Sequence, residues 1–264
     1  MRLSGISIYP VKSCAGIALE RVVLDHFGPA GDRRWLVVDE RRRFVSQREQ
    51  ARLALIRVEQ RPGGISLTAS GDSIDVDIPP ADAPEIRVTV WEDSVRALLA
   101  DRDTADWLSA QLGLPCRLVY MPDNCQRLVD GRYASEGETV SFADGFPLLL
   151  ISQASLNDLN SRLSNPVPMN RFRPNLVVSG CEPFAEDNWR RIRIGAVEFD
   201  DAKPCSRCVI PSIDQATAGR DPHINRVLAR YRRVNGQIMF GQNLLYQRTG
   251  QLALGDSVEV LAKR

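Results

Sequence analysis

Short runs of alternating apolar and polar residues, each ended by a turn residue, fill roughly the first hundred positions of this chain. Runs this short leave no room for long helices, and their regular spacing is typical of an all-β barrel or sandwich. The strands predicted from this pattern span residues 3–9, 18–24, 35–39, 43–46, 53–60, 65–69, 74–78 and 86–91.

One helix is predicted after these strands, from Asp103 to Gly113. Asp103 can cap its first turn, the apolar residues that follow recur at helical spacing, and Gly113 is a common helix stop.

The pattern changes after Pro122, where longer apolar runs and helical spacing replace the short alternating runs. Residues 147–151 form a continuous apolar strand, and Ser152 or Ser155 can cap a helix over residues 156–163. The polar stretch 214–233 is expected to hold a helix near its end. Further strands are predicted over residues 176–179, 191–199, 208–213, 237–240 and 257–261. We therefore expect a mainly β chain with some α, in two domains that span residues 1–120 and 121–264.

Charge and composition exclude several classes of protein. The 34 basic and 33 acidic side chains give a net charge of +1, which argues against a nucleic-acid-binding protein. The longest apolar run, residues 146–151, is far shorter than a membrane span needs, and the N-terminus lacks the features of a signal peptide. Six cysteines are too few for a disulfide scaffold, so we expect reduced thiols and a cytoplasmic location.

The motif Cys205-Ser-Arg-Cys208 is the sharpest local feature, and three interpretations of it compete. A zinc half-site needs a second ligand pair, and the other four cysteines are isolated. A redox dithiol usually opens a helix, whereas β-branched residues and Pro211 follow this motif. The two cysteines can also be small buried apolar groups. However, Lys203 and Arg207 favour thiolates, which bind soft or intermediate metals, and such cations can also hold an anionic cofactor.

Two further basic features allow both a structural and a functional interpretation. Arg171 and Arg173 fall on one side of an extended segment, which is either a solvated edge strand or a clamp for phosphate or carboxylate. The chain has only three lysines against 31 arginines, and Lys12 and Lys203 each stand two residues before a cysteine. This placement is either a coincidence, or it shows that these positions need the compact ammonium of lysine because the site is too tight for arginine.

The segment from Lys203 to Asp214 strongly resembles the signature of MOSC proteins, the molybdenum cofactor sulfurase C-terminal domain family. The resemblance is greatest to the branch of the mitochondrial amidoxime reducing component and its bacterial YcbX-type relatives. It runs nearly end to end, through residues 9–16, 31–35, 152–160, 171–175, 184–189 and 255–258. It implies an N-terminal MOSC β-barrel domain followed by a β-rich MOSC domain, which has a β-barrel core and a few helices.

The resemblance also implies a site for the molybdenum cofactor, Mo-molybdopterin. Cys208 matches the cysteine whose thiolate binds molybdenum, and Cys205 is then only a neighbour. Asp144 matches a loop that contacts the cofactor and is a candidate catalytic residue by its position alone. The other positions that match cofactor-binding residues are Lys12, Ser13, Arg33, Gly145, Arg173 and Asn175. Lys12 would then place a compact ammonium against the phosphate oxygens.

The activity that the resemblance implies is reduction of small N-hydroxylated compounds such as amidoximes, hydroxylamines or N-hydroxylated bases. The sequence has no four-cysteine motif for an iron–sulfur cluster, and we expect neither a membrane anchor nor a C-terminal ferredoxin-like domain. Electrons are therefore expected from a separate donor protein of a ferredoxin- or flavodoxin-type reductase system. One alternative is a module that binds the cofactor or carries sulfur without substrate turnover. Another is a β-rich scaffold that loads no metal.

Overall fold

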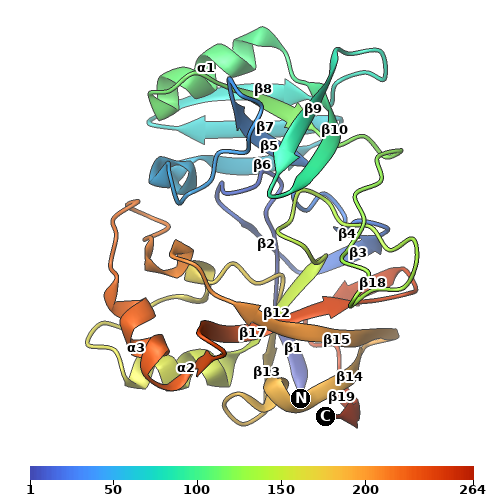
Figure 1. The fold of residues 1–264 in the computed structure, drawn as a ribbon, viewed down its shortest axis with the longest axis vertical. Coiled ribbons are helices and arrows are strands. Elements are labelled where there is room, and N and C mark those ends of the chain that lie inside the picture. The colour runs from blue at the N-terminus through green and yellow to red at the C-terminus, as the bar shows by residue number, and fades with distance from the viewer.

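The computed structural model describes all 264 residues and shows two β-rich halves, one above the other in Figure 1. The upper half holds a four-stranded sheet of order β5-β11-β10-β9 and a three-stranded sheet of order β6-β7-β8. Helix α1 (Arg102–Leu112) packs against β8 and β11. The strands of this half are β5 (Trp35–Asp39), β6 (Arg57–Arg61), β7 (Gly64–Ala69), β8 (Asp72–Asp77), β9 (Glu85–Val90), β10 (Asp93–Leu99) and β11 (Cys116–Tyr120).

The lower half is organised around one large sheet of order β19-β14-β15-β17-β12-β13-β1-β2, with β16 paired to β17. Helices α2 (Gln153–Ser161) and α3 (His223–Tyr231) lie beside this sheet (Figure 1). Its strands are β1 (Arg2–Ile8), β2 (Ile17–Leu19), β12 (Leu148–Ser152), β13 (Leu176–Ser179), β14 (Trp189–Ile194), β15 (Val197–Ser206), β16 (Arg233–Val234), β17 (Gln237–Leu245) and β19 (Val258–Lys263). A small sheet of order β18-β3-β4 joins β18 (Gly250–Ala253) to β3 (Arg21–Asp25) and β4 (Gly28–Pro29).

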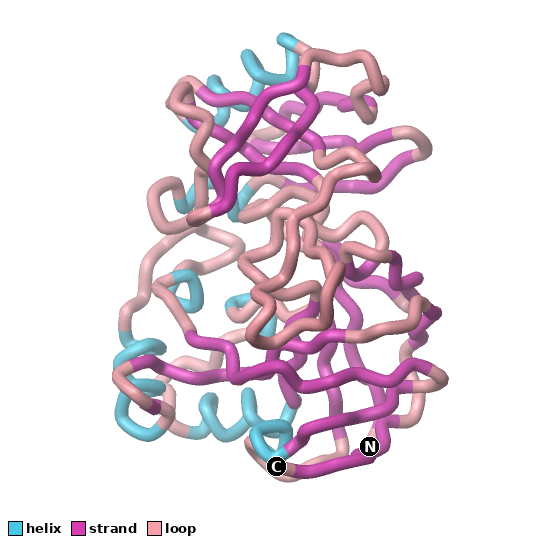
Figure 2. The backbone as a smooth tube through the Cα atoms, turned by 45° about the vertical axis from the view of Figure 1, so that its right-hand side comes forward, coloured by secondary structure: helices cyan, strands magenta, loops and turns pink.

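The first strands of the chain belong to the lower half, together with strands from the second half of the sequence. Strand β1 pairs antiparallel with β13, and β3 pairs antiparallel with β18, so the first strands are hydrogen-bonded to the second half of the sequence. The division at residue 120 stays a prediction, but the strand pairing shows that residues 2–29 build sheets of the lower half. The loop between β1 and β2 therefore lies at the border of the two halves, where loop segments gather (Figure 2).

Each half has an apolar core. Successive side chains of a strand point to opposite faces of the sheet, and the apolar ones lie on the face that is covered. In β7 the side chains of Ile65, Leu67 and Ala69 point inward, whereas the first four residues of β5 are all buried and all apolar. Helices α2 and α3 share a separate cluster with Phe172 and Phe240. No helix in the structure is both long enough and apolar enough to cross a lipid bilayer.

Most predicted elements are confirmed in position, and their caps are informative. The predicted helix after the first strands is α1, but its N-cap is Asp101, whose side chain accepts from the Thr104 N–H at 2.7 Å. Gly113 ends it in the left-handed conformation, as predicted. Ser152 caps α2, which begins three residues earlier than the apolar spacing predicted.

Several strand predictions are wrong for local reasons. Residues 43–46 make only isolated bridges, and Ala51–Leu55 forms a 3-10 helix before β6 begins. The single strand predicted over residues 191–199 is a hairpin, since Gly195 turns at φ +56°. Residues 208–213 form no strand, because β15 ends at Ser206 and a 3-10 turn containing Pro211 follows. Strands β10, β11 and β18 were missed in the sequence, and the run predicted over residues 18–24 divides at Glu20 between two sheets.

A buried carboxyl group in the large sheet should make stability depend on pH. Burial raises the pKa of Asp201 from its ordinary 3.8 to about 7, against the opposing charge of Arg264, while Asp187 and Glu186 raise it further. Because the folded protein holds this proton more tightly than the unfolded chain, its free energy of unfolding should fall as the pH rises from about 4 to about 7.

Asp201→Asn should remove this effect, so the variant should gain stability relative to the native protein as the pH rises across that range. The gain corresponds to about 1.4 kcal/mol for each unit of raised pKa. Urea unfolding of both proteins at about pH 4.5 and about pH 8 measures it. An equal difference between the two proteins at both pH values would contradict the assignment.

Candidate functional site

A cavity of about 690 Å³ opens at the border of the two halves, a size typical of small-molecule sites. All eight side chains or backbone positions predicted as site residues line it, although their roles stay predictions. They come from loops that are far apart in sequence: the β1–β2 loop, the turn before β5, the loop before β12, the segment before β13 and the loop after β15. Loop residues positioned by rigid sheets are the usual makers of binding sites.

The cavity wall is strongly cationic although the whole chain is nearly neutral. Asp144 is the single acidic residue in the lining. The cationic residues in the lining are Lys12, Arg33, Arg48, Arg173, Lys203, Arg207 and Arg233. So many cations around one enclosed space favour an anionic ligand over a neutral or cationic one.

Lys12 is buried and held at two points. Its ammonium donates to the Phe142 carbonyl at 2.7 Å and to Asp144 Oδ1 at 2.6 Å. Burial lowers the pKa of Lys12 to about 8, since the favourable charge of Asp144 only partly offsets the loss of water. Lys12 is therefore still mostly protonated at neutral pH, and its ammonium is fixed in place at the cavity wall.

Two arginines lie against the ring of Tyr9, with Arg33 4.4 Å and Arg173 4.1 Å from the ring centroid. Arg33 is paired with Asp32 at 2.5 Å. Arg173 has no carboxylate partner, and its guanidinium donates only to the neutral amide of Gln215 at 3.3 Å. Burial lowers the pKa of Arg173 to about 10. A buried guanidinium without a counter-ion is costly, and an anionic ligand would offset that cost.

Backbone strain is concentrated at this site. Nine residues other than glycine have positive φ, and four of them line the cavity: Ser13 at +72°, Arg33 at +47°, Trp91 at +57° and Arg173 at +55°. Such conformations cost free energy and persist at ligand sites, where the surrounding structure enforces them.

Two predicted residues contribute through shape and positioning. The Asn175 side chain makes three hydrogen bonds: its oxygen accepts from Arg33 at 3.0 Å and from the Leu149 N–H at 3.2 Å, and one N–H of its amide donates to the Ser7 carbonyl. Asn175 therefore positions Arg33 and has little capacity left for a ligand. Gly145 is the opposite case, since a Cβ there would meet no atom and would point into open space.

Asp144 is held as a carboxylate. Its Oδ1 accepts from Lys12 and, at 3.3 Å, from the indole N–H of Trp91, while Oδ2 lies 4.0 Å from Arg48. The surrounding protein atoms tend to raise its pKa, but the charges of Lys12, Arg48 and Arg33 prevail and hold the pKa well below its usual range. Water still reaches 63% of its side-chain surface. A low pKa counts against the predicted role of Asp144 as a catalytic acid.

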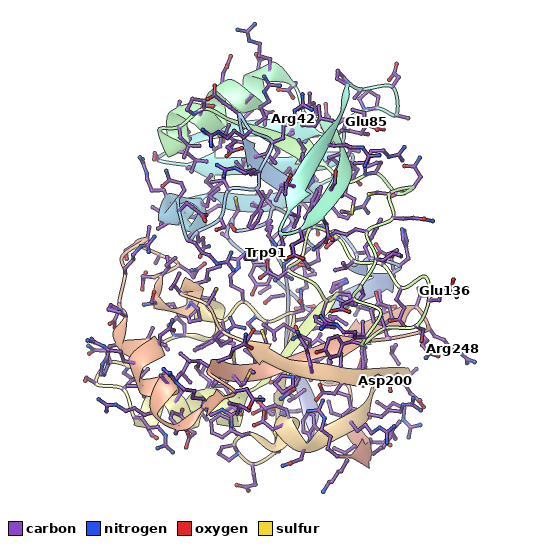
Figure 3. All side chains as sticks on the ribbon, in the orientation of Figure 1. Arg42, Glu85, Trp91, Glu136, Asp200 and Arg248 are labelled. Atoms are coloured by element: carbon purple, nitrogen blue, oxygen red, sulfur yellow. The ribbon has the colours of Figure 1, made fainter.

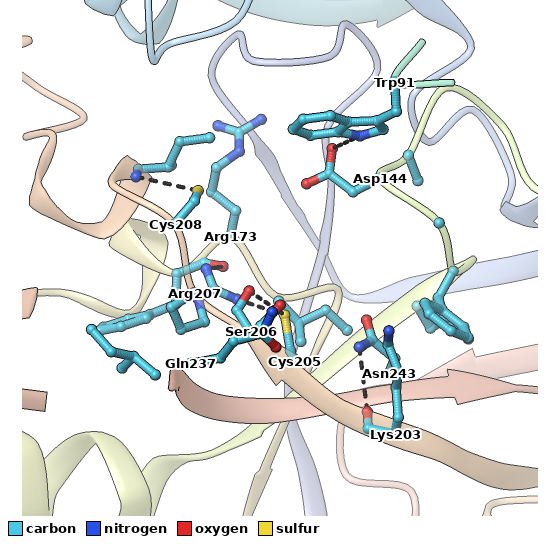
Figure 4. Close-up of a pocket in the computed structure, with 18 of the residues that line it drawn as sticks. Trp91, Asp144, Arg173, Lys203, Cys205, Ser206, Arg207, Cys208, Gln237 and Asn243 are labelled. Atoms are coloured by element: carbon cyan, nitrogen blue, oxygen red, sulfur yellow. Dashed lines mark hydrogen bonds between the residues drawn. The ribbon is translucent and has the colours of Figure 1, made fainter. Parts of the chain in front are cut away.

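The two motif cysteines have different partners. Cys208 Sγ accepts from Arg48 Nη2 at 3.4 Å and from the Ile210 N–H at 3.5 Å. Cys205 Sγ accepts from Arg207 at 3.1 Å. Figure 4 shows Cys208 higher in the cavity, near Arg173, and Cys205 at its base.

Lys203 and Arg207 were expected to place positive charge beside both sulfurs, but Arg207 contacts only Cys205 and Lys203 contacts neither sulfur. The Lys203 ammonium lies over the rings of Tyr133 and Phe146, at 4.9 and 5.5 Å from their centroids. The cation that contacts Cys208 is Arg48, which the sequence analysis missed. Arg48 stands 160 residues away in sequence, and no local pattern around it indicates the contact.

Trp91 is the second residue that the sequence analysis missed. It stands at the tip of the β9–β10 hairpin, lines the cavity and lies between the two halves in Figure 3. Its side chain is 46% exposed, which is unusual for the apolar end of a predicted strand. Only the tertiary structure brings this hairpin over the loop that carries Asp144.

These features fit a cofactor that carries a phosphate and a soft metal. Arg173 offers an unpaired buried charge, Gly145 leaves open space at the wall, and Cys208 presents a sulfur ligand beside Arg48. Lys12 and Arg33 add cationic charge on the same lining, as a phosphate group requires.

Comparison with known proteins also points to the molybdenum cofactor. The model of the MOSC N-terminal beta barrel domain matches residues 1–115, and the model of the MOSC domain matches residues 137–259. Mitochondrial amidoxime-reducing component 1 of Mus musculus is 32% identical over 276 residues, which cover 97% of this chain and 81% of that protein. Its Homo sapiens counterpart is 31% identical over 97% of this chain and 82% of its own length.

Molybdenum cofactor sulfurase of Oryza sativa subsp. japonica is also similar. It is 32% identical over 272 residues, which cover 94% of this chain but 33% of the sulfurase. The chain thus corresponds to about a third of that larger protein.

The unpaired charge of Arg173 can be tested without any cofactor. In protein prepared without molybdenum, Arg173→Met should raise the free energy of unfolding by about 1 kcal/mol, because a buried cation without a counter-ion is removed. Inorganic phosphate should raise the melting temperature of the native protein and leave that of the variant unchanged.

Arg102→Met is the matched control, since the Arg102 side chain is 91% exposed and does not line the cavity. This control should keep both the native stability and the phosphate effect. A destabilised Arg173→Met protein that still responds to phosphate would contradict an anion site at Arg173.

Proposed function

The chain belongs to the MOSC family, and from that premise we propose that it is a molybdenum-cofactor-dependent oxidoreductase that reduces N-hydroxylated compounds. The observation that carries the proposal is the cationic cavity, in which the sulfur of Cys208 and the unpaired guanidinium of Arg173 line one space. The relatives named as amidoxime-reducing components support the substrate class.

In this proposal the phosphate of the pterin lies against Arg173, Arg33 and Lys12, and Ser13 lies beside it. Cys208 binds the metal, and Asp144 and Gly145 form the wall of the loop before β12. The bound cofactor would supply the two-electron chemistry by which an oxygen atom is removed from nitrogen.

The protein's own groups would tune and orient this chemistry. Arg48 donates to Cys208 Sγ, and N–H donors to a ligating sulfur stabilise its negative charge. Asp144 stays ionised, and its Oδ2 accepts no hydrogen bond, so it can accept one from an N–H or O–H group of the substrate. The cavity opens to water at Asp144, so solvent can provide the protons that leave with the oxygen atom.

Electrons would come from a separate donor protein, which we propose to be of the ferredoxin or flavodoxin type. We also propose that the protein works in the cytoplasm. All six cysteines are unpaired in the structure, as suits a reducing compartment, although the named amidoxime-reducing relatives are mitochondrial.

A second candidate function is a module that binds the cofactor or carries sulfur without substrate turnover. The match to a molybdenum cofactor sulfurase favours it. The two candidates differ in one measurable property, since a carrier would bind the cofactor and would not reduce benzamidoxime with an artificial electron donor.

Single cysteine variants test the proposal through the same assay. Cys208→Ala should abolish benzamidoxime reduction, and Cys208→Ser should lose nearly as much, because a hydroxyl is a harder and less acidic ligand than a thiol. Cys205→Ser is the matched control three residues upstream. It should cost about 1–2 kcal/mol of stability and keep substantial activity.

Equal loss of activity in the Cys205 and Cys208 variants would instead support a zinc site or a dithiol. An active Cys208→Ala protein would rule out the thiolate ligand, and a native protein that holds cofactor without turnover would support the carrier.

A further inference from the structure

Trp91 is the most exposed of the four tryptophans, at 46%. Trp35 and Trp189 are only 3% and 4% exposed, and Trp107 is partly covered by the core of the upper half. Exposing an indole at the border of two packed halves forgoes the favourable burial of its apolar surface. The position therefore calls for a ligand or a contact that uses this surface.

The ring is fixed in orientation from several sides. Its N–H donates to Asp144 at 3.3 Å, the Arg48 guanidinium lies 4.6 Å from the ring centroid, and Phe44 packs at 5.1 Å with a 60° tilt. Its backbone is held at φ +57°, a conformation that a bulky residue rarely adopts. A strained and oriented aromatic residue at a cavity is a common feature of a ligand site.

Trp91 also provides the accessible aromatic surface of this cavity. Among the aromatic residues of the lining it is the most exposed, since Phe172 is fully buried and Phe146 is only half-buried. Figure 4 shows the indole and Cys208 on opposite sides of the cavity, with the Arg173 guanidinium between them. A planar molecule that reaches toward Cys208 could thus lie against the part of the Trp91 indole that Arg48 leaves exposed.

We propose that Trp91 selects planar substrates, such as arylamidoximes and N-hydroxylated bases, by stacking against their plane. This inference rests on the proposed reductase function and adds a substrate preference to it. Asp144, hydrogen-bonded to the same indole, accepts an N–H of the stacked substrate through its unoccupied oxygen. Small non-planar hydroxylamines gain nothing from the indole and are bound by the remaining groups alone.

A purely positioning role for Trp91 makes a different prediction. If the indole only holds Arg48 beside Cys208, its loss should impair every substrate to the same extent. If it stacks on substrate, the loss should fall on planar substrates and appear mainly in KM.

Steady-state reduction of benzamidoxime and of N-methylhydroxylamine by the loaded enzyme separates the two roles. Trp91→Ala should lower kcat/KM for benzamidoxime about tenfold, the usual scale of lost aromatic stacking, and change that for N-methylhydroxylamine less than about twofold. Trp91→Phe should keep most of the benzamidoxime activity. Equal losses for both substrates, or no loss for either, would overturn the proposal.

A binding measurement decides the question independently of turnover. Without an electron donor, benzamidoxime should quench the tryptophan fluorescence of the native protein. Trp91→Phe should lose this quenching. Trp107→Phe should retain it, because the Trp107 indole is hydrogen-bonded to Asp72 and does not line the cavity. Quenching that persists in Trp91→Phe, or is absent in the native protein, would overturn the role of Trp91. A native protein that reduces neither compound but shows the Trp91-dependent quenching would contradict the reductase function alone.

Discussion

Antiparallel pairing of β1 with β13 joins the start of the chain to its second half, and the cavity depends on this pairing. It places Tyr9, directly after β1, against the segment before β13, where the Tyr9 hydroxyl donates to the Pro174 carbonyl at 3.1 Å. Arg33 and Arg173, 140 residues apart, then lie against the same ring. Without this strand pairing, the cationic residues of the two halves would have no common ligand space.

The distribution of charge follows from the same arrangement. The whole chain has a net charge of +1, but seven cations and a single carboxylate line the cavity. The electrostatic potential in the cavity is therefore positive, which the overall composition does not indicate. Three of these cations have carboxylate partners: Asp32 pairs with Arg33, and Asp144 pairs with Lys12 and, more distantly, with Arg48. Arg173 remains without one, and the left-handed backbone at that residue adds to the cost. Free energy lost at a site in this way is typical of a protein built to bind a ligand there.

The sequence predicted the β-rich class and most strands, because alternation and turn residues are local signals. It also predicted residues that the structure brings to one cavity, because Lys12, Arg173 and Cys208 lie in motifs that carry the family resemblance. Arg48 and Trp91 lie outside those motifs, and their roles arise from tertiary contacts with Cys208 and Asp144. The expected thiolate partner Lys203 was wrong for the same reason, since sequence proximity does not decide where a flexible side chain points.

The central claim is that this cavity holds a molybdenum cofactor through its cations and one cysteine sulfur. The most direct measurement is the metal and pterin content of the native protein, purified from a host that synthesises the cofactor. The account predicts about one molybdenum per chain, an extractable pterin and little zinc, since Cys208 has no second ligand pair of the kind a zinc site needs. Stoichiometric zinc without molybdenum would contradict it.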